Sequence, residues 1–260
     1  MKEILDFIKI NPAGNMTVLI DNFDIYRRDI ANISVKLMCE TNIYAEQVGF
    51  IKGNHLQMMG GEFCGNASRA FASLLGFRDE SLKDKKIYSI TCSGEDKILD
   101  VEVRRGKTEN TFLAKIKMPS CISISEVNIK NNKNETEKFY LVKFSGIDHF
   151  IYEGKTDENE IIELIKKYMM DKNYSAFGIM FFDFLNMKLR PYVYVNGISG
   201  VWENSCASGT TALGFYLKKY KNIEKARVDE INGWLEYSFD KNDIYIDGPV
   251  EIIAEGKVYI

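Results

Sequence analysis

Apolar and polar positions alternate in short runs along most of the chain, a pattern typical of half-buried β-strands. The alternation predicts strands at residues 3–10, 16–20, 46–51, 55–59, 86–92, 98–103, 112–118, 139–144, 178–184 and 189–195. Near the end of the chain it predicts several short strands, among them residues 244–246, 250–254 and 258–260. Helical spacing of apolar residues predicts amphipathic helices over residues 25–38 and 158–170. The polar segment 128–137 is expected to be an exposed excursion.

Two further helical runs each begin directly after a cysteine in a loop of small residues. Cys64 lies in the loop at residues 61–68, and Cys206 lies in the loop at residues 202–210. The apolar residues that follow are Ala67, Ala70, Phe71, Leu74 and Leu75 in the first run, and Leu213, Phe215, Tyr216 and Leu217 in the second. We therefore expect each cysteine at the N-terminus of a buried helix. Free amides and the positive end of the helix dipole lower a thiol pKa there and can hold a carboxylate.

A single buried cysteine near a helix start is usually a packing residue, but two similar loops far apart suggest a duplicated half-chain. Strands, a cysteine loop and a helix recur in both parts, which predicts an α+β fold in which a mixed sheet wraps around a central helix twice. Two thiols facing each other suit one reaction: a proton is removed from one face of a carbon and returned on the other. Cys39, Cys92 and Cys121 are interpreted as small core residues.

Composition narrows the class of protein without identifying the reaction. The 260 residues are 45% hydrophobic and carry a net charge of −3, so we expect a packed core and no nucleic-acid partner. The chain has no apolar run long enough to cross a membrane. Five cysteines, an odd number, fit a reducing compartment. We therefore expect a cytoplasmic protein with no membrane partner.

Neither a metal nor an organic cofactor is expected. The two histidines, His55 and His149, lie far apart, and no cysteine pair has zinc-site spacing. A glycine-rich dinucleotide motif is absent, and no lysine has a local feature that marks a pyridoxal-phosphate anchor. Chemistry at the two thiols is therefore expected to depend on protein groups alone.

The two cysteine loops resemble those of the diaminopimelate epimerase superfamily of cofactor-independent amino-acid racemases. The shared features are a Cys-Gly-Asn loop at Cys64 and a Cys-x-Ser-Gly-Thr loop at Cys206. Three further stretches, residues 11–17, 39–50 and 202–206, are more similar to one branch, the histidine racemases of the staphylopine metallophore pathway. The resemblance covers essentially the whole chain.

The resemblance implies two pseudo-symmetric halves, each a mixed sheet wrapped around a central helix, with the active site in the cleft between them. Residues 1–118 would form the half with Cys64, and residues 119–260 the half with Cys206. Whether the last strand returns to the first half is left open. The superfamily relatives also suggest a homodimer.

The resemblance also assigns site residues. Cys64 and Cys206 would be the acid–base pair, and His149 would orient or deprotonate one of them. Glu203 would influence Cys206 or contact the amino-acid substrate. The expected substrate contacts come from Asn15, Glu46, Gln47, Gln57, Gly65, Asn66, Ala207, Ser208 and Gly209. Glu46 stands where the epimerases carry Asp and where the histidine racemases carry Glu.

Departures from the epimerase pattern bear on the substrate. The epimerases hold the distal carboxylate of diaminopimelate with the arginine of a Glu-Arg-Gly stretch, and this chain has Val-Asn-Gly at residues 195–197. Arg190 does not obviously replace that arginine, and Gln57, Ile147 and Tyr174 stand near the positions of the epimerases' distal asparagines. A pocket without the arginine should bind a second carboxylate poorly. Histidine is therefore the preferred substrate, with Glu46 accepting an imidazole N–H.

Other functions stay open at this point. The chain could be a diaminopimelate epimerase or an amino-acid racemase of broader specificity. It could also be a catalytically silent amino-acid-binding module, although retention of both cysteines argues against this. Superfamily branches that isomerise carbon skeletons or double bonds generally lack the cysteine pair. The panel of amino acids that exchange their α-proton would separate these functions.

Overall fold

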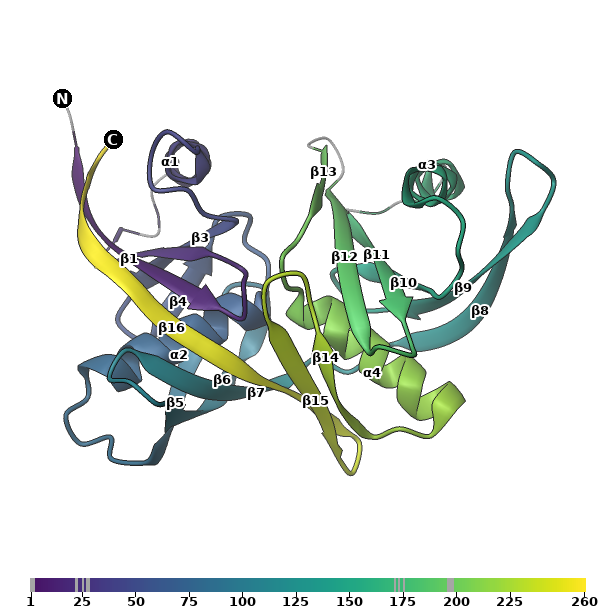
Figure 1. Cartoon of the computed structure of the whole chain (residues 1–260). Helices are drawn as coiled ribbons and strands as arrows, with labels where there is room; N and C mark the ends of the chain where they lie inside the picture. Colours follow the sequence, from purple (N-terminus) through teal and green to yellow (C-terminus); the bar gives the residue numbers. More distant parts are fainter. Residues whose placement is uncertain are drawn as a thin grey trace.

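The computed structural model describes residues 3–21, 23–24, 26, 29–170, 172, 174, 176–195 and 199–260. These residues form an α+β structure with a mixed sheet of 16 strands and four helices (Figure 1). The strands are β1 (Ile4–Pro12), β2 (Thr17–Ile20), β3 (Gln47–Lys52), β4 (His55–Met58), β5 (Lys85–Cys92), β6 (Glu95–Arg105), β7 (Thr111–Met118), β8 (Ser123–Lys130), β9 (Thr136–Lys143), β10 (Asp148–Tyr152), β11 (Ala176–Asp183), β12 (Lys188–Val195), β13 (Ser199–Trp202), β14 (Lys225–Asp229), β15 (Trp234–Asp240) and β16 (Asp243–Tyr259). The helices are α1 (Ile30–Met38), α2 (Gly65–Arg78), α3 (Glu158–Met169) and α4 (Ala207–Lys221).

One hydrogen-bonded path runs through the sheet, in the order β1-β2-β3-β4-β5-β6-β7-β16-β15-β14-β12-β11-β10-β9-β8, with β13 paired to β12. Four of its neighbouring pairs are parallel, namely β2–β3, β4–β5, β12–β14 and β10–β11. Because β1 also pairs with β16, the strands β1 to β7 and part of β16 close into a ring. Helix α2 contacts strands of this ring, whereas α4 contacts β9, β10, β11, β14, β15 and β16.

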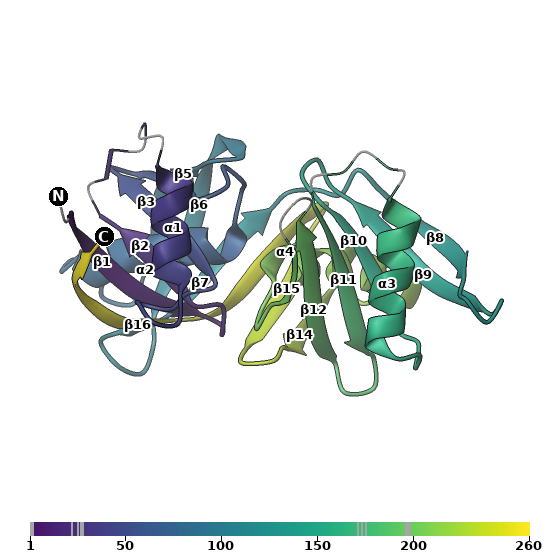
Figure 2. The same ribbon diagram turned by 90° about the horizontal axis from the view of Figure 1, so that it is seen from above.

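Figure 2 shows two lobes lying side by side. We call β1 to β7 with α1 and α2 the first lobe, and β8 to β15 with α3 and α4 the second lobe. The long strand β16 belongs to both, because it pairs with β15 of the second lobe and with β7 and β1 of the first. The chain therefore passes between the lobes twice, once after β7 and once along β16.

The prediction of three short strands near the C-terminus was wrong, because β16 is one continuous strand of 17 residues. Its residues 243–247 pair with β15, and its residues 250–259 pair with β1. Gly248 and Pro249 lie where β16 changes partners on this edge, and both stay paired with β7 on the other edge. A proline is tolerated in a strand where no N–H has to be donated, so these two residues do not end the strand.

The polar segment 128–137 is the end of a hairpin formed by β8 and β9 rather than a separate excursion. Only its tip, residues 131–135, lies outside the strands, and most of its side chains are exposed. The hydrophobic pattern also left β8, β10, β13, β14 and β15 unpredicted. Leu235, Tyr237 and Phe239 alternate with polar residues in β15, so that strand could have been predicted, whereas β13 and β14 have only four and five residues.

The two outer helices are amphipathic, as predicted. Helix α3 buries Ile161, Ile162 and Ile165 against the second lobe. Helix α1 begins at Ile30. The predicted start at residue 25 lies outside the described residues, as do residues 27 and 28.

The inner helices α2 and α4 are buried on nearly all sides. Small residues such as Ala67, Ala70 and Ala72 are buried in α2, which lets the surrounding strands approach the helix closely. The inner helices therefore form the scaffold that carries the two cysteine loops.

In the described part of the chain, no helix is both long enough and apolar enough to cross a membrane.

Candidate active site

Cys64 caps the N-terminus of α2, as predicted from the sequence. Its Sγ atom accepts a hydrogen bond from the Ala67 amide at 3.4 Å, and its carbonyl accepts the Ser68 amide at 2.9 Å. The first amides of a helix have no partner within the helix. At this end the amides of Gly65 and Asn66 are therefore the ones available to a carboxylate.

Cys206 has the same position on α4. Its Sγ atom accepts the Gly209 amide at 3.3 Å, and its carbonyl accepts the Thr210 amide at 2.9 Å. This geometry leaves the amides of Ala207 and Ser208 without a partner in the helix. The two cysteine loops are thus built alike, although they lie in different lobes.

The N-termini of the two inner helices meet. A Cβ atom placed on Gly65 would lie 3.1 Å from the Cβ of Ala207 and 2.9 Å from the Met118 side chain, so only glycine fits there without movement. Asn66 Nδ2 donates to the Ser205 carbonyl at 3.2 Å and so joins α2 to the second cysteine loop. The positive ends of both helix dipoles consequently point at one region between the lobes.

A chain of side chains links the Cys64 thiol to the second lobe. The Sγ of Cys64 donates to Gln47 Oε1 at 2.9 Å, and Gln47 Nε2 donates to Asn15 Oδ1 and to Thr17. Asn15 Nδ2 then donates to Glu46 Oε2 at 3.1 Å. Three residues predicted for the site, Asn15, Glu46 and Gln47, are therefore brought together beside Cys64.

Glu46 completes this chain by contacting the loop that carries Cys206. Its Oε1 accepts Asn204 Nδ2 at 2.5 Å, and its Oε2 accepts the Asn204 backbone amide at 3.2 Å. Asn204 in turn accepts a hydrogen bond from Asn232 Nδ2 at 2.6 Å. Both oxygens of Glu46 are thus occupied by asparagine donors from the two lobes.

Cys206 is surrounded by polar and acidic groups. Its Sγ lies 3.4 Å from Ser208 Oγ, which lies 3.1 Å from Nε2 of His149 in β10. The charge of Glu203 acts on the Cys206 thiol and raises its pKa, and the Cys206 amide donates to Glu230 Oε2 at 2.6 Å. The structure therefore brings His149 and Glu203 to the same cysteine.

Burial raises the pKa of both thiols in this structure, opposite to the direction expected from the helix termini. Burial raises the pKa of Cys64 to about 12, and the bond from the Ala67 amide opposes this only in part. The pKa of Cys206 lies well above its usual value because of burial and the nearby charge of Glu203. Loss of solvation outweighs the helix dipoles at both thiols.

The ionisable neighbours of Cys206 are shifted as well. Burial raises the pKa of Glu203 to about 7 and that of Glu230 to about 8. Burial lowers the pKa of His149 to about 3, so its imidazole is neutral at physiological pH. His149 Nδ1 has no hydrogen-bond partner among the described residues. A neutral His149 can orient Ser208 and Cys206 but supplies no positive charge.

Gln57 is not joined to this network in the described structure. Its side-chain amide donates to the Met58 carbonyl at 2.9 Å, and it lies near Gly61 at the start of the first cysteine loop.

Residues 196 and 197, where the chain departs from the epimerase Glu-Arg-Gly stretch, lie outside the described residues. Among the described residues, no cluster of three or more His, Cys, Asp or Glu side chains could hold a metal ion.

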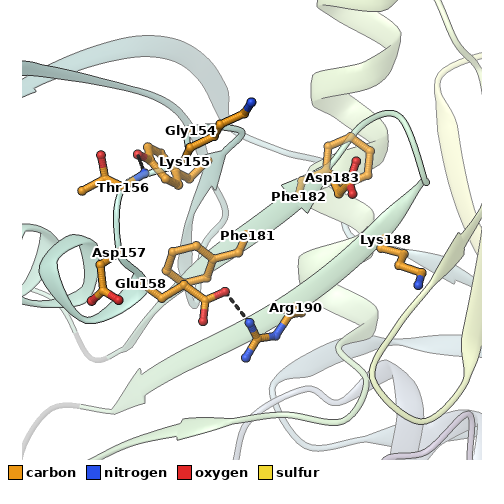
Figure 3. Close-up of a pocket in the computed structure, with 11 residues that line it drawn as sticks. Gly154, Lys155, Thr156, Asp157, Glu158, Phe181, Phe182, Asp183, Lys188 and Arg190 are labelled. Atoms are coloured by element: carbon orange, nitrogen blue, oxygen red, sulfur yellow. Dashed lines mark hydrogen bonds and ion pairs between the residues drawn. The ribbon is translucent and has the colours of Figure 1, made fainter.

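A cavity of about 480 Å³ lies on the second lobe, away from the thiols (Figure 3). Residues of the β10–α3 connection and of β11 and β12 line it. Arg190 lies in this wall, where its Nη1 donates to Glu158 Oε1 at 2.5 Å and its guanidinium covers the Trp202 ring. The Arg190 guanidinium thus contacts Glu158 and Trp202, the first residue of the second cysteine loop.

Three residues near the thiols were not predicted, namely Arg69, Asn204 and Glu230. A lone charged residue usually lies at the surface, so nothing local marks Glu230. Arg69 carries a usable signal, because α2 has small or apolar residues on every side and offers no solvated face for an arginine. Asn204 lies within the stretch 202–206 that was already singled out.

Solved structures with low sequence identity share the fold. A predicted epimerase from Pseudomonas aeruginosa has a TM-score of 0.69 at 8% identity, over 98% of this chain and 99% of that one. A phenazine biosynthesis PhzF family protein from Enterococcus faecalis has a TM-score of 0.58 at 13% identity, over 99% of this chain and 100% of that one. At these identities the likeness supports the architecture alone.

Sequence comparison is more specific. Residues 4–259 match the family described as histidine racemase CntK N-terminal domain. A histidine racemase from Fusobacterium nucleatum subsp. nucleatum is 62% identical over 99% of this chain and 98% of its own length. A histidine racemase from Staphylococcus aureus is 28% identical over 100% of this chain and 99% of its own length. The chain therefore belongs to the histidine racemase CntK family.

Proposed function

We propose that this protein is an isomerase that interconverts L- and D-histidine without a cofactor, with Cys64 and Cys206 as its two acid–base groups. The observation that supports these roles is the pair of capping cysteines on two buried helices whose N-termini meet at Gly65 and Ala207. The substrate is inferred from the full-length relatives named histidine racemase. One thiolate removes the α-proton, and the opposite thiol returns a proton to the other face.

The carboxylate of the substrate is the group that needs stabilisation. The α-proton of an amino acid is weakly acidic, and its removal puts enediolate charge on the carboxylate. The amides of Gly65, Asn66, Ala207 and Ser208 would bind this group at the positive ends of both helices, where preformed dipoles lower the barrier. The Cys206 amide takes no part in this binding, because Glu230 already accepts its hydrogen bond.

Formation of a thiolate has to overcome the raised pKa values of the resting site. The ammonium group of the substrate would bring a positive charge between the thiols and so favour the ionised form of one of them. The charge of Glu203 acts on the Cys206 thiol and its pKa is raised to about 7, which suits a group that accepts the Cys206 proton and returns it. His149 would hold Ser208 against Cys206 as a neutral imidazole.

Glu46 is our candidate for recognition of the imidazole. It lies between the lobes within the Asn15–Asn204 network, and a carboxylate oxygen can accept more than one hydrogen bond. The described residues place Arg190 with Glu158 in the separate cavity, which leaves no assigned arginine for a second substrate carboxylate. This favours histidine over diaminopimelate.

At the scale of the molecule we propose two pseudo-symmetric halves, residues 1–118 and 119–260, with the active site between their inner helices. Strand β16 would fasten the second half back to the first. A homodimer and a cytoplasmic location are further proposals. Light scattering of the purified protein and fractionation of cells that express it would test them.

The function is tested with purified protein that is free of pyridoxal phosphate and added metal. L-Histidine in deuterium oxide should become D-histidine and gain deuterium at the α-carbon. In direct competition, LL-diaminopimelate should turn over more slowly than L-histidine; faster turnover would make the protein a diaminopimelate epimerase. Tight histidine binding with no exchange for any amino acid would instead indicate a silent binding module.

A further inference from the structure

Glu230 is a buried acid that the mechanism above leaves without a role. It follows β14 directly, and only 9% of its surface is exposed. Its own amide donates to the Gly233 carbonyl at 2.9 Å, which fixes the turn that carries it. A carboxyl group is costly to bury unless hydrogen bonds compensate, so its partners indicate what holds it there.

Both oxygens of Glu230 are bound to the start of α4. Oε2 accepts the Cys206 amide at 2.6 Å, and Oε1 accepts the hydroxyl of Thr210 in the first turn of the helix. Glu230 therefore holds the amide of Cys206 and the first turn of the helix that follows it.

The charges around Cys206 come from several elements and are mostly acidic. Glu203 follows β13 and its charge raises the pKa of the thiol, whereas His149 in β10 reaches the thiol through Ser208 as a neutral ring. Arg69 in α2 is the cation whose charge interacts with Glu230, but its guanidinium donates to Ala114, Asn66 and Pro249 rather than to Glu230. An ionised Glu230 is therefore only weakly compensated, and it opposes a second negative charge on Cys206.

We propose that Glu230 is a positioning residue for Cys206, which holds the thiol loop on α4 and, when ionised, keeps Cys206 in its thiol form. This inference rests on the proposed function, because it assigns Cys206 as the group that rests protonated and returns a proton after Cys64 has removed one. It also makes Cys206 sensitive to pH in a way that Cys64 is not. The pKa of Glu230 is raised to about 8, so the effect should appear as pH passes that value.

Glu230→Gln separates the two parts of this role. The glutamine oxygen can still accept the Cys206 amide, and the Thr210 hydroxyl can turn to accept from the new NH₂ group. The variant thus keeps the hydrogen-bonded shape and removes the charge. Glu236→Gln is the matched control, because Glu236 lies on neighbouring β15 and pairs with Lys225 at the surface.

The test is the rate at which a small thiol reagent alkylates each cysteine in the native protein. Peptide mass spectrometry would measure the modified fraction of each thiol over time. This measurement does not depend on histidine turnover. The role of Glu230 can therefore be refuted while the racemase activity is confirmed, and the racemase activity can be refuted while the role of Glu230 is confirmed. At about pH 9, Cys206 in Glu230→Gln should react about tenfold faster than in the wild type, which corresponds to one unit of thiol pKa. The two proteins should react alike at about pH 6.5, and Cys64 should differ by less than about twofold throughout.

A general loosening of the loop gives a different result. Faster reaction of Cys206 at every pH, or equal acceleration of Cys64, would mean that Glu230 only supports the fold and would overturn the proposal. An unchanged Cys206 rate at high pH would overturn it as well. If the variant does not fold, the wild-type profile decides: above about pH 8 the Cys206 rate should rise by less than the tenfold per pH unit of an isolated thiol, and a full tenfold rise would contradict the role of Glu230.

Discussion

Glu46 joins the two cysteine loops through hydrogen bonds that a carboxylate accepts and a carboxamide cannot reproduce. It receives the amide group of Asn15 from the first lobe and both the backbone and side-chain N–H groups of Asn204 from the second. All of these partners are donors. The charge of Glu46 is therefore needed for the network that leads from Cys64 to the Cys206 loop, whether or not it also binds the imidazole.

Glu46→Gln should lower kcat/KM for histidine racemisation by about tenfold to a hundredfold. The NH₂ group of the new glutamine would face the N–H donors of Asn15 and Asn204 and would have no acceptor. An unpaired buried polar group costs about 1–3 kcal/mol. Steady-state kinetics in both directions would measure this. Glu40→Gln is the control, because Glu40 is exposed and should leave the rate unchanged. A wild-type rate in Glu46→Gln would show that the network does not need the carboxylate.

At the scale of elements, the contact between the N-termini of α2 and α4 sets the separation of the thiols. Gly65 is the closest point, because an added Cβ would lie 3.1 Å from Ala207 Cβ. The Met118 side chain can move aside, whereas Ala207 is fixed in its helix. Any side chain at position 65 must push the two helices apart by a few tenths of an ångström.

Gly65→Ala should therefore reduce racemisation by about tenfold, because small misplacements of reacting groups are costly. The fold should be retained, since alanine favours helix more than glycine. Gly146→Ala is the control, because a Cβ there meets nothing within 4 Å. Full activity in Gly65→Ala would mean that the helix contact does not determine thiol geometry.

The local pattern of apolar and polar residues predicted those helices and strands whose structure depends mainly on their own residues. The cysteine caps, α3 and most strands followed from periodicity and small residues alone. The continuous strand β16 could not be predicted in this way, because Gly248 and Pro249 usually interrupt a strand. Its continuity depends on pairing with β7, β15 and β1. Glu230 and the raised pKa values of the thiols depend on burial, which contacts distant in sequence create. Arg69 could have been found from the missing polar face of α2.

At the scale of the whole molecule, Arg69 ties the first cysteine helix to the two strands that connect the lobes. It is fully buried and donates to the Ala114 carbonyl in β7, to the Pro249 carbonyl in β16 and to Asn66 Oδ1. Arg69 thereby holds together the helix, both connections and the asparagine that reaches the second loop.

Arg69→Met should lower the free energy of unfolding by on the order of 3 kcal/mol, because three buried acceptors lose their donor. Urea unfolding would measure it. Arg78→Met, at the exposed end of the same helix and paired with Asp21, should cost less than about 1 kcal/mol. Equal or higher stability of Arg69→Met would mean that burying the guanidinium costs more than its bonds return.

The raised carboxyl pKa values also predict how stability depends on pH. The folded protein keeps Glu203 protonated to about pH 7 and Glu230 to about pH 8, whereas both ionise near 4.5 when unfolded. The folded state therefore binds more protons across this window, so the contribution of these groups to stability falls as pH rises from 4.5 to 8. The unfolding free energies of wild type and Glu230→Gln, measured by urea at about pH 5 and pH 8.5, should diverge in favour of the variant at the higher pH. A constant difference would contradict the shift assigned to Glu230.

The two-thiol mechanism is tested most directly by α-proton exchange of each histidine enantiomer in deuterium oxide with Cys64→Ser and Cys206→Ser. Each single variant should lose racemisation by about 10²–10⁴-fold, because a serine hydroxyl is too weak an acid to rest as the anion. Each should still exchange one enantiomer, opposite for the two variants, and the double variant should exchange neither. Cys39→Ser, Cys92→Ser and Cys121→Ser should keep racemisation. Loss of only a few-fold in either single variant, or wild-type racemisation by the double variant, would contradict the mechanism.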